Sequence, residues 1–370
     1  MGQASSTQTS TANIHTNNNT ESLPLAMPAT QEKTVDHFSQ RRREVNQCRF
    51  DESSNKGHYE SYFLRANHPE KPQAFWIRYT LFSPKGRPAD TIGELWVIYF
   101  DGATHQVTAA KEEIAFSKCS FSRDGLAVKI SDIATLQPGL AKGSAALNGN
   151  KITWHLRYSL AEEPLLLLPE SFYDAPLPKA KALVGNPNAL FNGTLMVNGE
   201  TICVENWQGS ENHNWGEKHT DRYAWGQVAG FDNDPEAFLE MGTARLKIGP
   251  LWTPWMTTLV LRFDGREIKI NNLMKAVTAK ATFNYFNWHV ETRQGDIAVV
   301  VDMYAPRYHF VGLNYYNPPG GSNTCLNSKI AGCRVVVREK GKPERILETQ
   351  HRGAFEILTD DQSHGVKVVA

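Results

Sequence analysis

Residues 206–231 combine aromatic and ionisable side chains at a density that a protein core does not need. Aromatic bodies with a few polar tips are typical of the wall of a small-molecule cavity. The alternative is an aromatic core between two packed sheets, in which Gln227 and Asp221 would be costly without partners. We therefore favour a ligand-binding cavity lined by Asn214, Trp215, Tyr223, Trp225 and Gln227.

A strand over residues 221–231 would sort its side chains onto two unlike faces. Because alternate residues of a strand point to opposite sides, one face collects the large and polar residues Asp221, Tyr223, Trp225 and Gln227. The other face carries small residues such as Ala224 and Gly226, which let another sheet approach closely. The large face is expected to line the cavity.

Two histidines, His213 and His219, lie close to this strand. A zinc site needs three or more converging ligands, and this spacing does not match a familiar zinc motif. Histidines that form hydrogen bonds within the fold are favoured, and no metal is predicted. The chain also has no Gly-x-Ser-x-Gly elbow, no phosphate-cradling glycine loop and no dinucleotide fingerprint.

Two carboxylates, Asp221 and Glu60, are candidate proton donors. A carboxylic acid in an apolar, aromatic pocket has a raised pKa and can act as a general acid. His213 is a third candidate, and aromatic faces, including that of Tyr62, could stabilise a carbocation. The alternative is that both carboxylates face solvent or pair with nearby arginines.

The elements that must position these residues are strands. Apolar and aromatic runs of strand length recur along the chain, among them Ala74–Phe82, Glu94–Phe100, Lys151–Tyr158, Thr257–Phe263 and Ile297–Val301. Asn-Gly and Asp-Gly pairs supply the positive φ angles of two-residue hairpins, and they begin at positions 101, 124, 148, 198 and 264. Helical periodicity is almost absent, so the sequence predicts an all-β chain of antiparallel hairpins.

The two halves of the chain resemble each other, which indicates an internal duplication. In the clearest correspondence, Phe100-Asp101-Gly102 matches Phe263-Asp264-Gly265, and Tyr62 aligns with Tyr223. Prolines punctuate residues 163–188, which we interpret as a linker. We expect a disordered tail over residues 1–44, a first β domain over 45–190 that ends in the linker, and a second β domain over 191–370.

Composition limits the partners and the compartment. The 370 residues include 39 basic and 39 acidic side chains, and this balance argues against nucleic acid as a partner. Five cysteines without close pairs indicate free thiols, so a cytoplasmic location is expected. No apolar run is long enough for a transmembrane helix, and the N-terminus lacks a signal-peptide core. The first six residues match a myristoylation pattern, which leaves peripheral membrane contact through Gly2 as an alternative.

The block Gly209-x-x-x-His213-Asn214-Trp215-Gly216, followed by Tyr223-x-Trp225-x-Gln227, resembles a family of tandem lipocalin-like proteins. The family contains AttH-like proteins, carotenoid 1,2-hydratases (hydroxyneurosporene synthases) and, more distantly, tocopherol cyclases. Residues 60–63 and 75–79, with Trp76, resemble its first domain. The resemblance extends over about residues 57–370 and implies two lipocalin-like antiparallel β-barrel or sandwich domains packed side by side.

The resemblance also implies apolar small-molecule ligands, and hydration or cyclisation of isoprenoid double bonds that starts with a proton and uses no metal or organic cofactor. The hydratases carry an acidic residue at the position of Asn212. We expect the chain to bind an isoprenoid- or lipid-like molecule in an aromatic cavity between the two domains, with Trp76 and Tyr62 adding to the wall. The rival hypotheses are a non-catalytic lipid carrier, which Asn212 favours, and a carbohydrate-binding β-sandwich.

Overall fold

The computed structural model describes residues 1–2 and 38–369. Most of the tail predicted over residues 1–44 lies outside the described residues, but its last part does not. Residues 38–45 form a helix in which Arg42 and Val45 are buried. Arg42 Nη1 donates a hydrogen bond of 2.7 Å to the carbonyl oxygen of Glu162. Arg42 thus attaches this helix to the rest of the chain.

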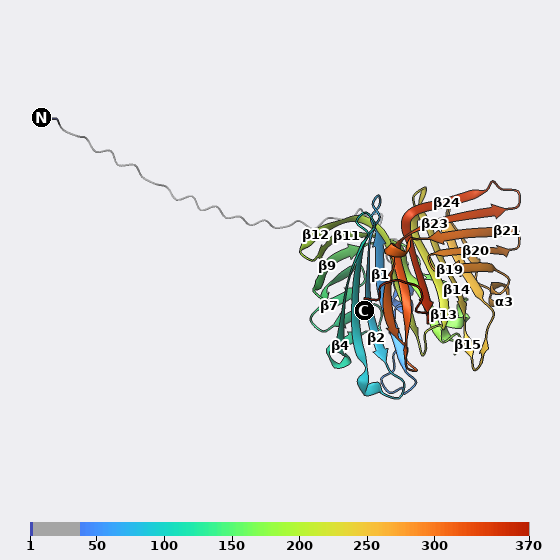
Figure 1. The fold of residues 1–370 in the computed structure, drawn as a ribbon, viewed down its shortest axis with the longest axis horizontal. Coiled ribbons are helices and arrows are strands. Elements are labelled where there is room, and N and C mark those ends of the chain that lie inside the picture. The colour runs from blue at the N-terminus through green and yellow to red at the C-terminus, as the bar shows by residue number, and fades with distance from the viewer. Residues whose placement is uncertain (3–37, 370) are drawn as a thin grey trace.

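Two large antiparallel sheets make up most of the described chain, which confirms the all-β prediction (Figure 1). The first sheet has the order β4-β3-β2-β1-β12-β11-β9-β8-β7-β6-β5, with β10 beside β11. Its strands are β1 (His58–Asn67), β2 (Gln73–Ser83), β3 (Ile92–Asp101), β4 (Gln106–Ala115), β5 (Cys119–Phe121), β6 (Val128–Ile130), β7 (Ala134–Gln137), β8 (Leu140–Leu147), β9 (Asn150–Tyr158), β10 (Leu165–Leu166), β11 (Ala180–Val197) and β12 (Glu200–Gly216).

The second sheet has the order β18-β17-β14-β13-β24-β23-β21-β20-β19, with β22 beside β23. Its strands are β13 (Arg222–Phe231), β14 (Asp234–Arg245), β17 (Met256–Phe263), β18 (Arg266–Ile270), β19 (Lys280–Asn284), β20 (Asn287–Gln294), β21 (Ile297–Tyr304), β22 (Val311–Tyr316), β23 (Ser322–Glu339) and β24 (Arg345–Thr359). A separate small hairpin is formed by β15 (Lys247–Ile248) and β16 (Leu251–Trp252).

Apart from the helix over residues 38–45, the helices are short and connect strands. They are α2 (Ser171–Asp174), α3 (Leu273–Ala276) and the 3-10 turns η1 (Pro88–Asp90), η2 (Phe116–Lys118) and η3 (Arg307–His309). No helix among the described residues is both long and apolar enough to cross a bilayer.

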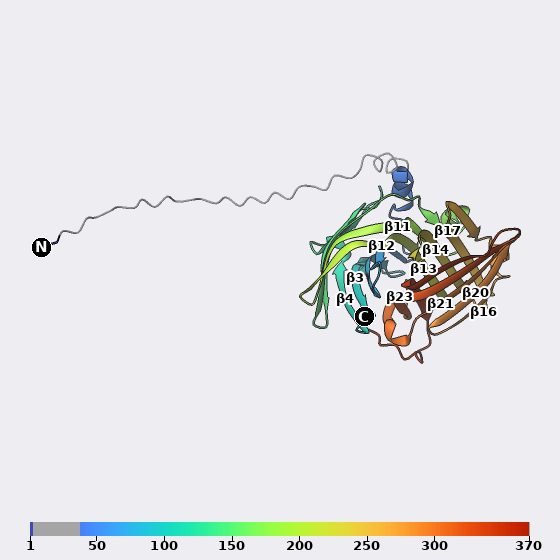
Figure 2. The same cartoon turned by 90° about the horizontal axis from the view of Figure 1, so that it is seen from above.

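Each sheet curls towards a barrel, and the two barrels lie side by side (Figures 1 and 2). In the first barrel, β4 comes round to meet β8 and β9. The backbone N–H of Ala146 donates to Glu112 Oε1 at 3.0 Å, and Asn150 Nδ2 donates to the carbonyl oxygen of Ala109 at 3.4 Å. We call the two curled sheets the first and second barrel.

Both barrel interiors are filled mainly with apolar side chains, which leaves the space between the barrels for the expected cavity. Phe75, Trp154 and Trp207 belong to the core of the first barrel, and Trp288 and Phe355 belong to that of the second. A third apolar cluster lies between the barrels and joins their outer faces. It contains Phe63, Trp76, Trp96, Ile98, Phe100, Leu313, Tyr315 and Ile330, with Tyr223 and Trp225 packed against it.

The two barrels share one connectivity, as a duplication predicts. In each barrel the first strand, β1 or β13, lies between the second strand and the last one. The residue-level alignment is wrong, however. Tyr62 belongs to the core inside the first barrel, whereas Tyr223 packs against the cluster between the barrels. A register error of one residue moves every side chain to the opposite face of a strand, and this explains the misplacement.

Three of the five predicted turn pairs form two-residue hairpins. Asn148-Gly149, Asn198-Gly199 and Asp264-Gly265 all have positive φ angles and join adjacent strands. The pairs that begin at positions 101 and 124 lie in longer connections. The boundary expected at 190/191 falls inside β11, and the chain passes from the first sheet to the second between β12 and β13. The proline-rich segment does not separate the two domains, because it leads into β11, which is a strand of the first sheet.

Candidate functional site

A cavity of about 650 Å³ lies between the outer faces of the two barrels. One wall comes from the first part of β1 and the middle of β2, and the other from β13, β14 and β17. Its lining is mostly apolar. Residues 167–183, which include α2, cover one side, and residues 218–221 and 246–248 contribute to its edge.

The wall from the first barrel follows from strand alternation. Tyr59 and Phe63 on β1, and Trp76 and Arg78 on β2, point away from the barrel interior and line the cavity. Their neighbours along each strand, such as Ile77, point inwards into the core. The outer face of these strands is apolar and aromatic because it is covered by the second barrel.

The wall from the second barrel is the face predicted from residues 221–231. Tyr223 and Trp225 line the cavity, as period two requires. Opposite them on β14 lie Ala244 and Gly242, whose small side chains leave space above the sheet. The rings of Tyr223 and Trp225 therefore lie beside small residues in this wall of the cavity.

The predicted site residues divide into two groups. The structure brings together in the cavity wall Trp76, His213, Asn214, Asp221, Tyr223 and Trp225. The other candidates do not line the cavity: Glu60, Tyr62, Trp215 and Gln227.

Glu60 is completely buried inside the mouth of the first barrel. It accepts hydrogen bonds of 2.9 Å from both His213 Nε2 and His58 Nε2, and two from the backbone N–H of Arg49. Burial alone would raise the pKa of the Glu60 carboxyl, but the bonds from the histidines outweigh it and hold the pKa well below its usual range. Glu60 is therefore an ionised anchor for residues 45–49 and does not suit a general acid.

His213, with Tyr62 and Trp215 beside it, also helps to hold residues 45–49 in place. The second ring nitrogen of His213, Nδ1, bonds to the carbonyl oxygen of Val45 at 2.8 Å, so both nitrogens are occupied. Tyr62 stacks on the imidazole with centroids 4.2 Å apart, and Trp215 lies 4.6 Å away on the same strand. Asn212 and Asn214, the neighbours of His213 along β12, also line the cavity, and His213 borders it with both of its ring nitrogens already bound.

Asp221 lies at the edge of the cavity with its carboxylate already engaged. Lys218 Nζ lies 2.5 Å from Oδ1, and the backbone N–H of Lys247 donates to Oδ2 at 2.9 Å. Both carboxylate oxygens of Asp221 are thus bound within the protein. Its contacts join the strand start to the β15–β16 hairpin.

Glu240 on β14 is the acid that the sequence analysis missed. It lines the cavity and is 2% exposed. Trp225 Nε1 donates to Oε1 at 2.7 Å, and Gln227 Nε2 donates to Oε2 at 2.8 Å. Burial raises the pKa of the Glu240 carboxyl to about 7, although both donors oppose the shift. Each carboxyl oxygen has a second lone pair, so a proton can be bound without breaking either bond.

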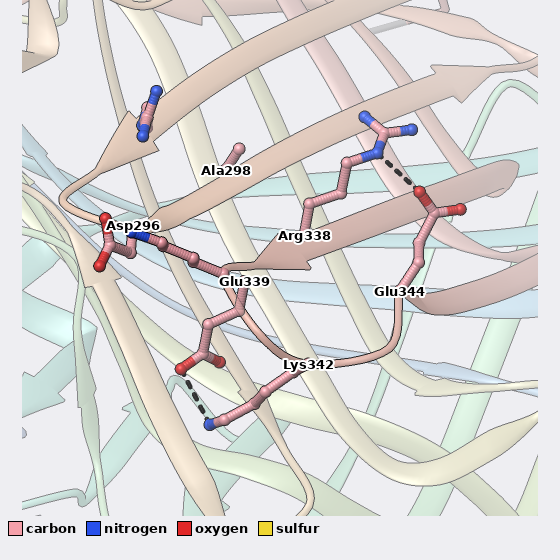
Figure 3. A pocket seen from close by; sticks show the side chains of 8 residues that line it. Asp296, Ala298, Arg338, Glu339, Lys342 and Glu344 are labelled. Atoms are coloured by element: carbon pink, nitrogen blue, oxygen red, sulfur yellow. Dashed lines mark hydrogen bonds and ion pairs between the residues drawn. The ribbon is translucent and has the colours of Figure 1, made fainter.

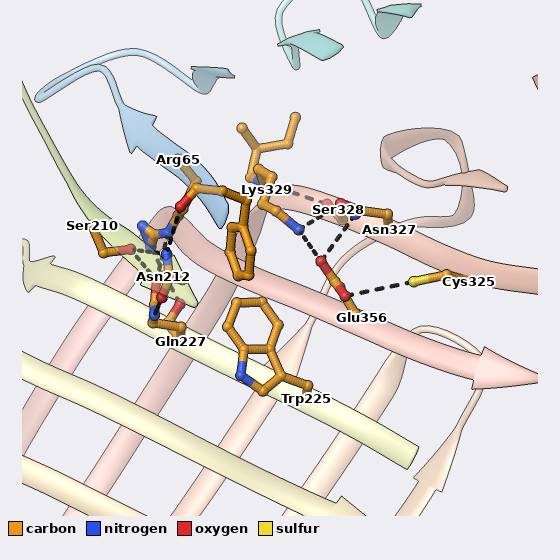
Figure 4. Close-up of polar contacts among 12 residues, drawn as sticks. Arg65, Ser210, Asn212, Trp225, Gln227, Cys325, Asn327, Ser328, Lys329 and Glu356 are labelled. Carbon is orange, nitrogen blue, oxygen red and sulfur yellow. Dashed lines mark hydrogen bonds and ion pairs between the residues drawn. The ribbon is translucent and has the colours of Figure 1, made fainter. Parts of the chain in front are cut away.

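Gln227 connects Glu240 to the position where the resemblance implies an acid. Its Nε2 donates to Asn212 Oδ1 at 2.7 Å as well as to Glu240, and its Oε1 accepts from Ser210 Oγ at 2.6 Å and from Arg65 Nε at 3.0 Å (Figure 4). Gln227, which was predicted to contact the ligand, therefore does not line the cavity but links Asn212 and Glu240 by hydrogen bonds. It brings the carboxyl of Glu240 close to the side chain of Asn212.

A buried ion pair lies on the other side of Trp225. Lys329 Nζ is 2.7 Å from Glu356 Oε1, and Asn327 Nδ2 donates to the same oxygen at 3.0 Å (Figure 4). The ammonium group lies 5.5 Å from the ring centroid of Trp225 and 5.6 Å from that of Trp76. The pair fixes both rings at the boundary between the barrels.

His219 is a neutral base in the cavity wall. Its ring stacks on Tyr59 with centroids 3.8 Å apart, and the side chain is 8% exposed. Burial, together with the neighbouring Arg78 cation, lowers the pKa of His219 to about 3. No group of three or more His, Cys, Asp or Glu side chains within residues 1–2 and 38–369 is arranged to hold a metal ion.

A second hollow, of about 430 Å³, lies at the far end of the second barrel (Figure 3). Its lining is almost entirely charged, and the charges neutralise one another. Arg338 Nε lies 2.6 Å from Glu344, and Lys342 Nζ lies 2.8 Å from Glu339. This hollow is charged and lacks an apolar wall, so the inter-barrel cavity is the candidate site.

The fold and this cavity define an all-β protein of two lipocalin-like barrels. No family model matches the chain. An uncharacterized protein of Mycobacterium tuberculosis, found in two strains, is 26% identical over 216 residues. The matched region spans 58% of this chain and 64% of the relative, which is less than two thirds of the relative's length.

Three solved structures are similar in fold. An AttH-like protein from Nitrosomonas europaea has a TM-score of 0.52 and 13% identity, with 85% of this chain and 97% of that one covered. Kievitone hydratase from Nectria haematococca has a TM-score of 0.52 and 10% identity, with 86% and 92% covered. CghA has a TM-score of 0.50 and 10% identity, with 85% and 93% covered. The chain therefore shares the fold of AttH-like and hydratase-type proteins.

Proposed function

We propose that the chain binds a mainly apolar, isoprenoid- or lipid-like molecule between its barrels and protonates one of its carbon–carbon double bonds. Hydration or cyclisation would follow. The observation that carries the proposal is the position of Glu240, a buried carboxyl in the wall of an aromatic cavity. A general acid is most effective when its pKa lies near the working pH, and burial brings the pKa of Glu240 to about 7.

The proposed step balances without a further reagent. The O–H of Glu240 gives its proton to one alkene carbon, and the π electron pair forms the new C–H bond. The neighbouring carbon becomes a cation, which the ring faces of Trp76, Tyr223 and Trp225 stabilise. Water, or a second double bond, then attacks the cation. The proton released afterwards returns to the Glu240 carboxylate.

Two further observations support this chemistry. The hydratases that the sequence resembles carry an acid at the position of Asn212, and here Gln227 bonds to both Asn212 and Glu240. An acid from the neighbouring sheet would then replace the missing one. One of the proteins with a similar fold is itself a hydratase of kievitone.

The test begins with the molecule that the protein retains. Organic extraction and native mass spectrometry of the purified chain should identify a mainly apolar ligand. That molecule, or farnesol and geranylgeraniol if none is retained, is then incubated with the protein in D2O. Protonation by Glu240 predicts one carbon-bound deuterium in a hydrated or cyclised product.

Substitutions then assign the acid. Glu240→Gln should abolish deuterium incorporation and leave binding within about threefold, because an amide has no proton acidic enough to transfer. Asp221→Asn, which removes the earlier candidate, should reduce turnover far less. Full turnover in Glu240→Gln would exclude Glu240 as the acid. If turnover is lost in Asp221→Asn and kept in Glu240→Gln, Asp221 is the acid.

A non-catalytic carrier is the second candidate. It is favoured by the fact that both oxygens of Glu240 already accept N–H bonds from the protein. Under this alternative, Glu240 only satisfies Trp225 and Gln227. An extracted ligand that stays unchanged and gains no deuterium would support it. The carbohydrate-binding hypothesis required shallow, open aromatic rings, and the buried ring of Trp76 and the mostly apolar lining weigh against it.

A further inference from the structure

Arg78 on β2 is a buried cation in the cavity wall that the proposed protonation does not use. Its side chain is 4% exposed, and its guanidinium is charged at neutral pH. Among the described residues it donates one hydrogen bond, from Nη2 to Ser61 Oγ at 2.7 Å. Its Nε has no partner.

The nearby carboxylates do not form ion pairs with Arg78. Glu94 lies 3.0 Å from Lys111 Nζ, and Glu356 is paired with Lys329. Burial works against the charge of Arg78, but Tyr315, Glu94 and Glu356 outweigh it and raise the pKa of the guanidinium. Arg78 is therefore a cation whose close contacts, such as the Tyr315 ring 4.3 Å away, supply no counter-ion.

Trp76 adds a second unused donor on the same face. It precedes Arg78 by two residues on β2, so both side chains point to the cavity. Its indole Nε1 is buried and has no hydrogen-bond partner. A buried donor without a partner is unfavourable, so two of them in one wall mark a place for an acceptor.

We propose that the ligand carries a carboxylate at one end of its apolar body, and that Arg78 and Trp76 bind this group. The inference rests on the proposed function, because it names the polar end of the same ligand. A carboxylate fits the fork of a guanidinium and forms charge-assisted bonds that exclude water. It would supply the carboxylate in direct contact with Arg78 that the described residues do not provide.

This assignment also fixes the orientation of the ligand. Arg78 belongs to the wall from the first barrel, and Glu240 to the wall from the second. A molecule bound at Arg78 by its carboxylate lays its apolar body across Trp225 towards Glu240. The distance of a double bond from the carboxylate then decides which bond meets the acid.

Retinoic acid and methyl retinoate are suitable probes, because they share one isoprenoid body and differ only in the charge of the head group. Binding is measured by equilibrium dialysis at pH 8 for the full chain. We expect wild type to bind the acid at least about tenfold more tightly than the ester. Arg78→Met should remove this preference and keep the affinity for the ester within about threefold. Arg78→Lys should restore part of the preference.

Arg338→Met provides the matched control. It removes an arginine from the hollow at the far end of the second barrel and should leave both affinities unchanged (Figure 3). Equal binding of acid and ester by wild type would overturn the carboxylate assignment and leave the proposed function standing. Binding of neither probe would overturn both. A preference for the acid that persists in Arg78→Met would exclude Arg78 as its source. The wild-type comparison decides the matter even if a variant does not fold.

Discussion

At the residue scale, Glu240 shows how burial and hydrogen bonding compete. The protein interior disfavours its charged form, while the N–H groups of Trp225 and Gln227 favour it. The outcome is a pKa of about 7 in the folded protein, against 4.5 for an ordinary glutamate. Because the folded protein holds the proton more tightly, this carboxyl must make stability depend on pH.

The sign of that dependence can be derived. The contribution of Glu240 to stability is fully present below pH 4.5 and is lost as the pH rises towards about 7. One pKa unit corresponds to about 1.4 kcal/mol, so the total loss is about 3 kcal/mol. Glu240→Gln cannot titrate and should remove this slope. Urea unfolding between pH 4.5 and 8 measures it, and parallel curves for wild type and Glu240→Gln would contradict the assigned pKa.

The residues of the cavity wall were only partly predictable. Tyr223 and Trp225 followed from strand period alone. Glu60 and Tyr62 were misplaced, because self-similarity between the halves fixed their alignment but not which face they occupy. Glu240 was missed, although its context carries a signal. It is a lone acid in the apolar run Phe238 to Met241, and a charge there must meet a cavity or a second sheet.

At the element scale, β12 depends on very close packing between its neighbours β1 and β11. Gly209 pairs with Ala66 on one side and Ala189 on the other. A Cβ atom at Gly209 would collide with the backbone carbonyl oxygen of Arg65, which cannot move without breaking the ladder. Gly209, the first residue of the Gly209–Gly216 block, is therefore required for the close packing of β12 against β1.

Gly209→Ala should lower the free energy of unfolding by about 1–3 kcal/mol, because overpacking against backbone cannot be relieved by a rotamer change. Gly242→Ala is the control. Its added methyl would meet Leu167 Cδ2 at 3.8 Å, an ordinary contact, so its stability should stay within about 0.5 kcal/mol of wild type. Denaturant unfolding of both variants checks this, and equal stability of the two would refute the packing argument.

The elements were easier to predict than their grouping. Two-residue turns with asparagine or aspartate before glycine identify hairpins locally, and three of five did so. The passage from one sheet to the other has no local signature. Prolines in residues 163–188 mark an irregular segment, but β11 and β12 then return to β9 and β1 through contacts that no short stretch of sequence encodes.

At the scale of the whole molecule, Arg65 joins the two barrels. Its guanidinium donates from Nε to Gln227 Oε1 at 3.0 Å and from Nη2 to the carbonyl oxygen of Arg352 at 2.9 Å. Gln227 lies on β13 and Arg352 on β24, so both partners belong to the second barrel. Burial lowers the pKa of Arg65 to about 9, so it is still a cation at neutral pH.

Arg65→Met should destabilise the chain by several kcal/mol, since each buried acceptor left without a donor costs about 1–3 kcal/mol. The loss should be largest at the boundary between the barrels. Hydrogen exchange should therefore rise in β1, β13 and β24 more than in β8 and β20, which lie away from it. Uniform exchange in the variant would show that Arg65 does not hold the barrels together.

The cavity lies between the barrels and not inside either of them. Stability of the fold and binding of the ligand can therefore evolve separately. Residues inside each barrel maintain the fold, whereas residues on the outer faces shape the space between them. Substitutions that shift one barrel slightly against the other would reshape the whole cavity without touching either core. A lineage that carries this chain could thus acquire new ligands by adjusting how two unchanged halves fit together.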